Sequence, residues 1–248
     1  MQNQFDPRTR SADPAISVGV PRAARDAGLR SYMLSIYNYM ASGVLLTGII
    51  ALLFAPYAQD TLISQSGRGL SGLGWIVTLA PLGFVMAMSF GVNRMQSSTL
   101  KLLFWGFAAI MGLSMSTIFI AYTGVSIAQT FFAVTAAFLG LSLYGYTTKR
   151  DLSGMGTFLI MGVVGLIVAM VINMFLQSSA MAFAISAIGV LIFAGLTAYD
   201  TQKLKSMYAY VSGNGEMMAK SVVMGALTLY LDFINMFQFL LSFMGDRR

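Results

Sequence analysis

The feature that most constrains the fold is a series of seven long apolar segments that occupy most of the chain. Each is long enough to cross the hydrocarbon core of a bilayer, which is about 30 Å thick and needs about 20 helical residues. Their length and their lack of alternating polarity predict helices rather than barrel strands. The predicted spans are Tyr32–Ala55, Leu73–Val92, Leu100–Tyr122, Ser126–Tyr146, Gly154–Phe175, Ala180–Tyr199 and Ser221–Met244.

Composition agrees with an all-α integral membrane protein and argues against several other classes. Only 10% of the residues are charged, whereas soluble domains carry roughly 25%. The 15 Lys and Arg residues form no dense patch, so the net charge of +6 does not indicate nucleic-acid binding. There is no Cys and no His, and no glycine loop suits a phosphate. We therefore expect no enzyme and no tightly bound cofactor.

The distribution of basic residues predicts the orientation in the membrane. Twelve Lys and Arg residues fall on one side of the predicted spans and three on the other, which places the N-terminus in the cytoplasm. An odd number of spans then places the C-terminus outside. Arg247 and Arg248 at the C-terminus favour the alternative, a last segment that enters the membrane and returns.

Residues 1–30 are polar and lack the apolar stretch of a secretory signal peptide. We interpret them as a solvated, disordered cytoplasmic tail, with a partner-binding segment as the alternative. The transmembrane domain is expected to comprise residues 31–248. Within it, the short connections "TGV" and "QSSA" predict tight helical hairpins. Small residues recur every four positions and predict close helix contacts, at Gly43, Thr47 and Ala51 and at Ala108, Gly112 and Ser116.

Two aspartates fall in or at the end of predicted spans, where a carboxylate costs several kcal/mol unless it is paired, protonated or hydrated. Asp200 ends "FAGLTAYD", and Asp232 lies inside "GALTLYLDFINMFQFLLSFMG". Thr228 and Asn235 share the helical face of Asp232 and predict a supporting polar stripe toward the interior. The alternatives are an interfacial salt bridge to Lys203 for Asp200 and a helix-to-helix hydrogen bond for Asp232.

The two aspartates are more informative as a pair, because their helices are consecutive and we expect them to pack together. Two carboxylates that share a site cannot both ionise cheaply. With no His in the chain, such a pair is the candidate pH sensor. When ionised, it would attract calcium, which prefers oxygen ligands. One obstacle is geometric: Asp232 lies about 16 Å along a straight helix from Ser221, whereas Asp200 is expected at the interface.

The stretches "AYDTQKLK" and "LYLDFINMFQFLL" resemble the signatures of the Bax inhibitor-1 family. The resemblance implies a seven-helix bundle with the C-terminal helix central and surrounded by the other six. For a bacterial member it implies a pH-sensitive calcium leak channel of the inner membrane. Asp200 and Asp232 would form its sensor and gate and would bind calcium in transit. Arg94 is the candidate salt-bridge partner of the pair, with a membrane anchor as its alternative role.

Two other functional hypotheses stay open. Some relatives resemble modulators of a membrane-anchored ATP-dependent protease, which an exposed N-terminal tail would suit. An intramembrane aspartyl protease would also use two aspartates on adjacent helices. That reading is disfavoured because Leu229, Tyr230 and Leu231 precede Asp232 in place of Gly-x-Gly. The expected partners are therefore the lipid bilayer, calcium ions and, as the alternative, the protease, without nucleic acid.

Overall fold

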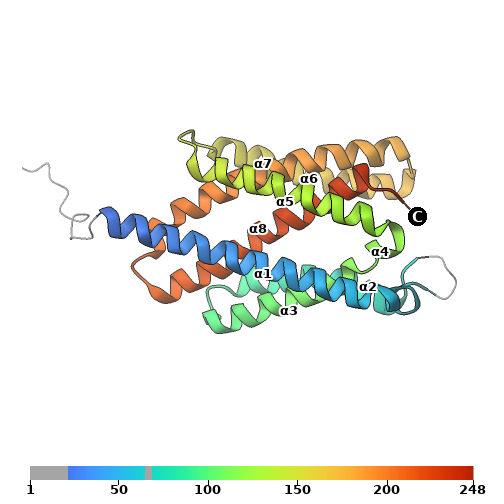
Figure 1. Ribbon diagram of the computed structural model, residues 1–248, viewed down its shortest axis with the longest axis horizontal. Coiled ribbons are helices and arrows are strands. Elements are labelled where there is room, and N and C mark those ends of the chain that lie inside the picture. Colours follow the sequence, from blue (N-terminus) through green and yellow to red (C-terminus); the bar gives the residue numbers. More distant parts are fainter. Residues whose placement is uncertain (1–21, 65–68, 248) are drawn as a thin grey trace, which may run out of the picture.

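The computed structural model describes residues 22–64 and 69–247, and these fold into a helical bundle (Figure 1). Seven of its helical segments are long and apolar enough to cross a membrane, which confirms the predicted all-α fold. The short α4 continues the third segment after a break. The helices are α1 (Arg22–Leu62), α2 (Gly72–Gly91), α3 (Ser97–Met115), α4 (Ile118–Ala121), α5 (Gly124–Thr147), α6 (Ser153–Leu176), α7 (Ser179–Val211) and α8 (Gly215–Met244).

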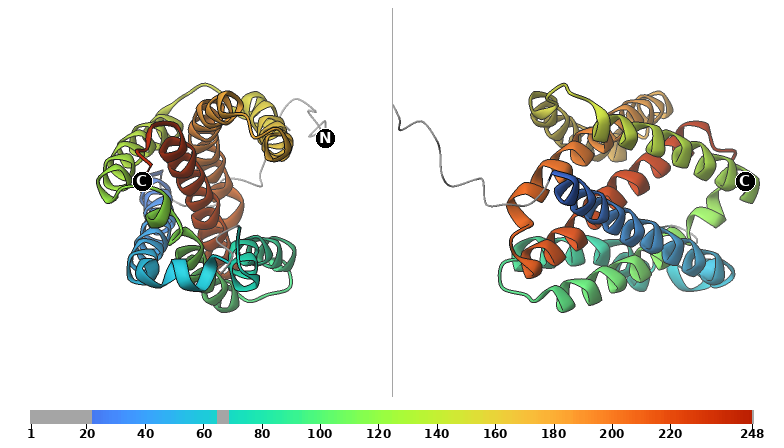
Figure 2. Two further views of the ribbon diagram at one scale, coloured as in Figure 1. Left: turned by 90° about the vertical axis from the view of Figure 1, so that its right-hand side faces the viewer. Right: turned by 60° about the vertical axis from the view of Figure 1, so that its left-hand side comes forward.

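The C-terminal helix α8 lies at the centre of the bundle, as expected (Figure 2). It packs against α1, α3, α5 and α7. The implied ring of six helices needs correction, because α2 packs mainly on α3 and α6 mainly on α7. In Figure 1, α8 runs diagonally between a layer of α1, α2 and α3 and a layer of α5, α6 and α7. Both faces of α8 therefore meet other helices.

The two ends of the bundle carry different connections. The start of α1 lies at the same end as the α2–α3, α5–α6 and α7–α8 connections, and the C-terminus lies at the other end (Figure 1). α8 is one continuous helix of 30 residues. The alternative of a last segment that enters and returns is therefore wrong. The C-terminal residues dock beside the α4–α5 connection, where Asp246 N donates to Ser126 Oγ at 3.0 Å.

Several helices extend beyond the apolar runs from which they were predicted. α1 begins at Arg22, inside the segment predicted as a tail (residues 1–30), and residues 1–21 lie outside the described residues. Arg and Ala are strong helix formers, which explains a helical start in a polar segment. α7 continues to Val211, where "SGN" makes the turn, and Asn214 Oδ1 caps the start of α8. Hydropathy marks the membrane, whereas capping and turn residues end the helix.

The predicted small-residue contacts are found between α1 and α3. Thr47 Oγ1 donates to Ala108 O at 2.8 Å. A Cβ added to Gly112 would lie 2.8 Å from Thr47 O, so only glycine allows this approach. α5 and α7 meet in a similar way, since a Cβ on Gly145 would lie 2.2 Å from Ala198 O. Such contacts bring backbones together where lipid offers no hydrophobic driving force.

Candidate functional site

Asp200 on α7 and Asp232 on α8 come together in the middle of the bundle. Both residues are buried, with exposed fractions of 8% and 4%. Their carboxyl groups lie close enough to act on each other directly, within reach of a hydrogen bond. Because an ionised carboxylate can only accept, such a bond needs a proton on one of the two groups.

The antiparallel register of α7 and α8 places the two residues opposite each other. Toward the C-terminal end of α8, Ser186 Oγ donates to Ser242 Oγ at 3.1 Å. Toward its start, Ser221 Oγ donates to Met207 Sδ at 3.2 Å. Asp200 and Asp232 lie between these two contacts. The seam thus brings the two carboxyl groups to the same level of the bundle.

The predicted position of Asp200 at a helix end is wrong, and this removes the geometric obstacle. The apolar run ends at Tyr199, but α7 continues for eleven residues past Asp200, to Val211. That length corresponds to about 16 Å of helix. Asp200 therefore lies as deep in the bundle as Asp232. It is not exposed to the negative end of a helix dipole.

Few other polar groups reach the pair. Asp232 Oδ2 is buried and has no hydrogen-bond donor in the described part of the chain. Lys203, one turn along α7, is the cation that acts on Asp200 electrostatically. It forms no ion pair with Asp200 within the described residues, and its Nζ lies 5.8 Å from the centre of the Tyr199 ring. The alternative interpretation of Asp200, an interfacial salt bridge to Lys203, is therefore not found among the described residues.

The structure does not bring Arg94 to the aspartates. Arg94 lies in the turn after α2, where its backbone N donates to Gly91 O at 2.9 Å, and it is exposed. Over residues 22–64 and 69–247 it has no ion-pair partner. The proposed salt bridge to the pair is thus not formed in this structure. Its exposed position at a helix end suits the alternative role as an anchor.

Thr228 and Asn235 flank Asp232 on α8, as the sequence predicts, and both are half-buried. Each bonds to its own helix: Thr228 Oγ1 donates to Met224 O at 3.1 Å, and Asn235 Nδ2 donates to Leu231 O at 2.8 Å. Neither hydrogen-bonds to an aspartate. The carbonyl oxygen of Asn235 accepts no hydrogen bond from the described residues.

One polar chain beside the site was missed by the sequence analysis. Tyr37 on α1 hydrogen-bonds to Ser142 on α5, and Ser142 Oγ lies 3.0 Å from Thr201 Oγ1 on α7. Tyr37 and Ser142 also line a cavity of about 350 Å³ between α1 and α5. The chain ties the segment that carries Asp200 to two neighbouring helices. Polar residues inside apolar runs were the available signal, but nothing in the sequence pairs them.

A second buried polar cluster lies on the opposite side of α8. The Tyr230 hydroxyl is 2.6 Å from Thr47 Oγ1, which in turn donates to Ala108 O. Phe107 and Phe104 pack edge-on against the Tyr230 ring, with centroids at 5.0 and 6.3 Å. This cluster joins α1, α3 and α8, and its hydroxyl groups have partners.

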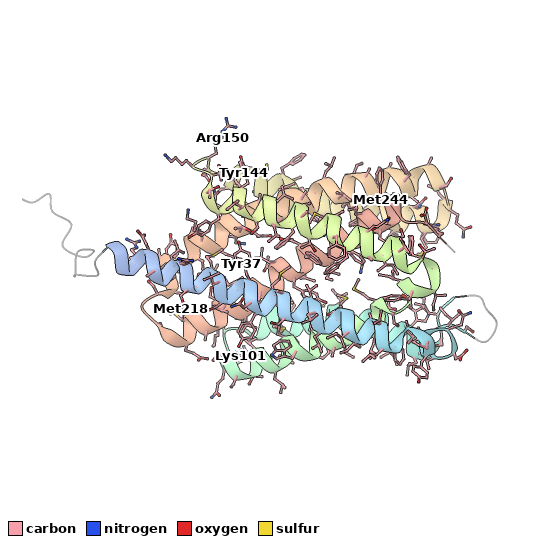
Figure 3. All side chains as sticks on the ribbon, in the orientation of Figure 1. Tyr37, Lys101, Tyr144, Arg150, Met218 and Met244 are labelled. Carbon is pink, nitrogen blue, oxygen red and sulfur yellow. The ribbon has the colours of Figure 1, made fainter. Side chains whose placement is uncertain are left out.

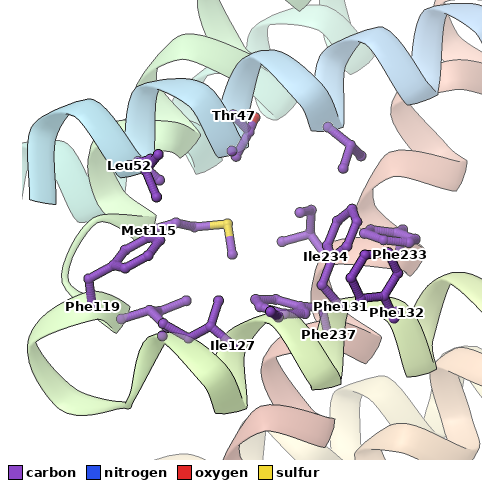
Figure 4. A pocket seen from close by; sticks show the side chains of 16 residues that line it. Thr47, Leu52, Met115, Phe119, Ile127, Phe131, Phe132, Phe233, Ile234 and Phe237 are labelled. Carbon is purple, nitrogen blue, oxygen red and sulfur yellow. The ribbon is translucent and has the colours of Figure 1, made fainter.

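An apolar cavity of about 260 Å³ lies between α1, α3, α4, α5 and α8 (Figure 4). Phe131, Phe233 and Phe237 cover one side of it. Thr47 is its one polar side chain, and that hydroxyl is already bonded to Tyr230 and Ala108. The cavity therefore offers no ligands to an ion. Across the whole described part of the chain, no group of three or more acidic residues could hold a metal.

Charged side chains gather at the ends of the bundle and leave its sides apolar (Figure 3). Arg150 and Lys101 mark the end at which α1 begins, and Met244 lies toward the other. Exposed Leu, Ile and Phe side chains on the helices, such as Leu53, Phe132 and Phe175, face outward with exposed fractions above 60%. This distribution suits a chain surrounded by lipid.

Comparison with known proteins extends these observations. Residues 29–248 match the sequence model of the family described as "Inhibitor of apoptosis-promoting Bax1". Protein RP147 of Rickettsia prowazekii is 48% identical, over 90% of this chain and 92% of its own length. A Caulobacter vibrioides protein is 46% identical, over 90% and 91%. The inner membrane protein YbhL of Escherichia coli K12 is 43% identical, over 90% and 94%.

Proposed function

The chain belongs to the Bax inhibitor-1 family of integral membrane proteins, and on that premise we propose that it is a pH-sensitive calcium leak channel gated by Asp200 and Asp232. The observation that carries the proposal is the buried pair of neighbouring carboxyl groups, in which Asp232 Oδ2 has no donor among the described residues. We further propose a bacterial inner membrane, which the name of the Escherichia coli relative supports, with the N-terminus in the cytoplasm.

The proposed gate follows from the chemistry of two adjacent carboxyl groups. At low pH both hold protons, the pair is neutral, and a hydrogen bond between the two groups joins α7 to α8. At higher pH the pair loses protons, and the remaining negative charge repels its neighbour and attracts a cation. Besides the pair itself, Lys203 is the charged group that acts on Asp200 among the described residues.

Calcium suits the pair as a transient ligand rather than as a resident cofactor. It binds six to eight oxygen atoms at about 2.3–2.6 Å. Two carboxyl groups supply at most four oxygen atoms, so water would complete the shell. A site that binds weakly lets the ion leave again, as conduction requires.

Packing on the N-terminal side of the pair supports a closed state. The Leu204 side chain lies against Gly225, where an added Cβ would be 2.8 Å from Leu204 Cδ2, and Ile36 closes on the same glycine from α1. One layer further, the Tyr32 hydroxyl bonds to Ser221 Oγ at 2.5 Å. Opening would require these layers to separate.

Calcium efflux from proteoliposomes between about pH 5 and pH 8 tests the proposal. We expect wild-type efflux to rise with pH and both Asp200→Asn and Asp232→Asn to lose most of that rise. Asp60→Asn is the matched control, because Asp60 is exposed on α1 and makes the same chemical change away from the pair. Efflux with an unchanged pH profile in both pair variants would refute the gate.

The role as a partner of a membrane-anchored ATP-dependent protease stays an alternative, because residues 1–21 lie outside the described residues. Deletion of residues 1–21 separates the two roles. Efflux that survives the deletion, together with a lost association with the protease, would assign the tail to the partner and the bundle to conduction.

A further inference from the structure

A polar groove opens between α6, α7 and α8 at the end of the bundle opposite the start of α1. Its volume is about 450 Å³, and half of its lining side chains are polar, namely Asn173, Ser186, Asn235, Gln238 and Ser242. A neighbouring cavity of about 620 Å³ between α6 and α7 is lined by apolar residues and glycines. Two hollows on the same helices thus differ in chemistry, and only the polar one reaches α8.

The groove leads toward the aspartates along the seam of α7 and α8. Ser186 and Ser242 hydrogen-bond across that seam at its outer end. At the inner end, Asn235 lines the groove. Asn235 and Asp232 are three residues apart on one face of α8, a rise of about 4.5 Å. The groove therefore ends one helical turn from the carboxyl pair.

Two side-chain amides in the groove have polar atoms without a hydrogen-bond partner among the described residues. Gln238 is exposed, and its side chain makes no hydrogen bond there. Asn235 uses its amide nitrogen on Leu231 O and keeps its carbonyl oxygen free. Gln238 lies six residues, about 9 Å, from the end of α8 at Met244. An unpaired amide at such depth is costly in lipid, so it calls for water.

We propose that this groove is a water-filled vestibule through which hydrated calcium ions reach Asp232 from the side of the membrane opposite the N-terminus. The inference rests on the proposed channel function and names its entry route. The carbonyl oxygens of Gln238 and Asn235 serve as the first protein ligands, which suits a hard cation. No Lys or Arg lines the groove to repel one.

The absence of cysteine from the chain makes the vestibule directly testable. Single cysteines are introduced by Gln238→Cys in the groove and by Leu191→Cys as the matched control. Leu191 is 71% exposed and lines the apolar cavity instead. It lies at a similar depth, because Gly189 on α7 packs directly against the Phe239 ring on α8. Gly213→Cys, in the exposed α7–α8 turn, marks the N-terminal side.

Each variant is exposed to a charged, membrane-impermeant methanethiosulfonate reagent, in intact cells and in inverted membranes. Because a thiol held in lipid forms little reactive thiolate, we expect the Gln238→Cys variant to react about tenfold faster than the Leu191→Cys variant. We expect it to react in intact cells, whereas the Gly213→Cys variant reacts only in inverted membranes. Modification of Gln238→Cys by a cationic reagent should also lower calcium efflux.

Equal rates for Gln238→Cys and Leu191→Cys would overturn the vestibule. So would reaction of Gln238→Cys only in inverted membranes, or its oxidation to a disulfide-linked dimer without reagent labelling, since polar residues also join helices of two copies. Labelling requires no transport, so the two proposals fail separately. A labelled groove with efflux independent of the aspartates refutes the gate, whereas an unlabelled groove with aspartate-dependent efflux refutes the vestibule.

Discussion

Tyr230 and Asp232 lie two residues apart on α8, and both are almost completely buried. They differ in whether their polar groups have hydrogen-bond partners. The Tyr230 hydroxyl is paired with Thr47, and aromatic rings surround it. Asp232 faces a second carboxyl group, that of Asp200, and keeps one oxygen without a donor among the described residues. On the Tyr230 side of α8 the buried polar groups have hydrogen-bond partners. On the Asp232 side two carboxyl groups crowd each other and one oxygen has no donor among the described residues.

The contrast separates the groups that hold the bundle together from those available for function. A buried polar group with partners costs little and fixes the position of its helices. An unsatisfied carboxyl group in a membrane costs several kcal/mol, and such residues mark ion or proton pathways. On the proposed function, α8 has a structural face toward α1 and α3 and a face toward α7 that serves the gate.

Removal of the Tyr230 ring should have the largest effect on stability. Tyr230→Ala leaves a cavity between Phe104, Phe107 and Thr47, and we expect a loss of roughly 3–5 kcal/mol in the free energy of unfolding. Unfolding of the purified protein by denaturant in detergent micelles measures it. A loss below about 1 kcal/mol would show that the α1–α3 face of α8 does not stabilise the bundle.

A smaller loss is expected where α5 meets the segment of α7 that carries Asp200. Gly145→Ala places a Cβ about 2.2 Å from Ala198 O, so we expect overpacking to cost about 1–3 kcal/mol. Gly140→Ala on the same helix is the matched control, because no atom lies within 4 Å of its added Cβ. Its better helix propensity should leave stability unchanged or higher. Equal melting temperatures for the two variants would contradict the close contact.

The smallest changes in the free energy of unfolding should differ in sign between the two faces of α8. Tyr230→Phe loses one hydrogen bond, so we expect it to destabilise by about 0.5–1.5 kcal/mol and to leave the pH response of efflux intact. Asp232→Asn removes a charge and adds a donor toward Asp200, so we expect unchanged or greater stability. Unfolding of both variants at neutral pH measures the difference. Destabilisation by Asp232→Asn beyond that of Tyr230→Phe would reverse the proposed division.

Hydropathy and helical spacing predicted the seven spans and the stripe of Thr228, Asp232 and Asn235, and the family resemblance implied the central α8. They failed where helices leave the apolar region, because α1 and α7 continue on polar residues that hydropathy does not count. Asp200 was therefore placed at a helix end instead of mid-bundle. The third span is broken after Met115, where Ser116 Oγ bonds back to Leu113 O.

Contacts between distant residues were beyond the reach of local patterns. The hydrogen-bonded side chains of Tyr37, Ser142 and Thr201 join three helices. No residue spacing within a single helix predicts that contact. The same holds for Arg94, whose match to a family position said nothing of the direction of its side chain. The pairing of the aspartates was predictable because their helices are consecutive and antiparallel. Contacts between helices that are distant in the sequence depend on how those helices align in the folded bundle.

The most direct test of the shared-proton gate is calcium efflux from proteoliposomes that contain the double variant Asp200→Asn/Asp232→Asn. If the two carboxyl groups act as one unit, the double variant should lack the rise in efflux between about pH 5 and pH 8 and should differ little from either single variant. A double variant that unfolds like the wild type and keeps the full pH response would contradict the account.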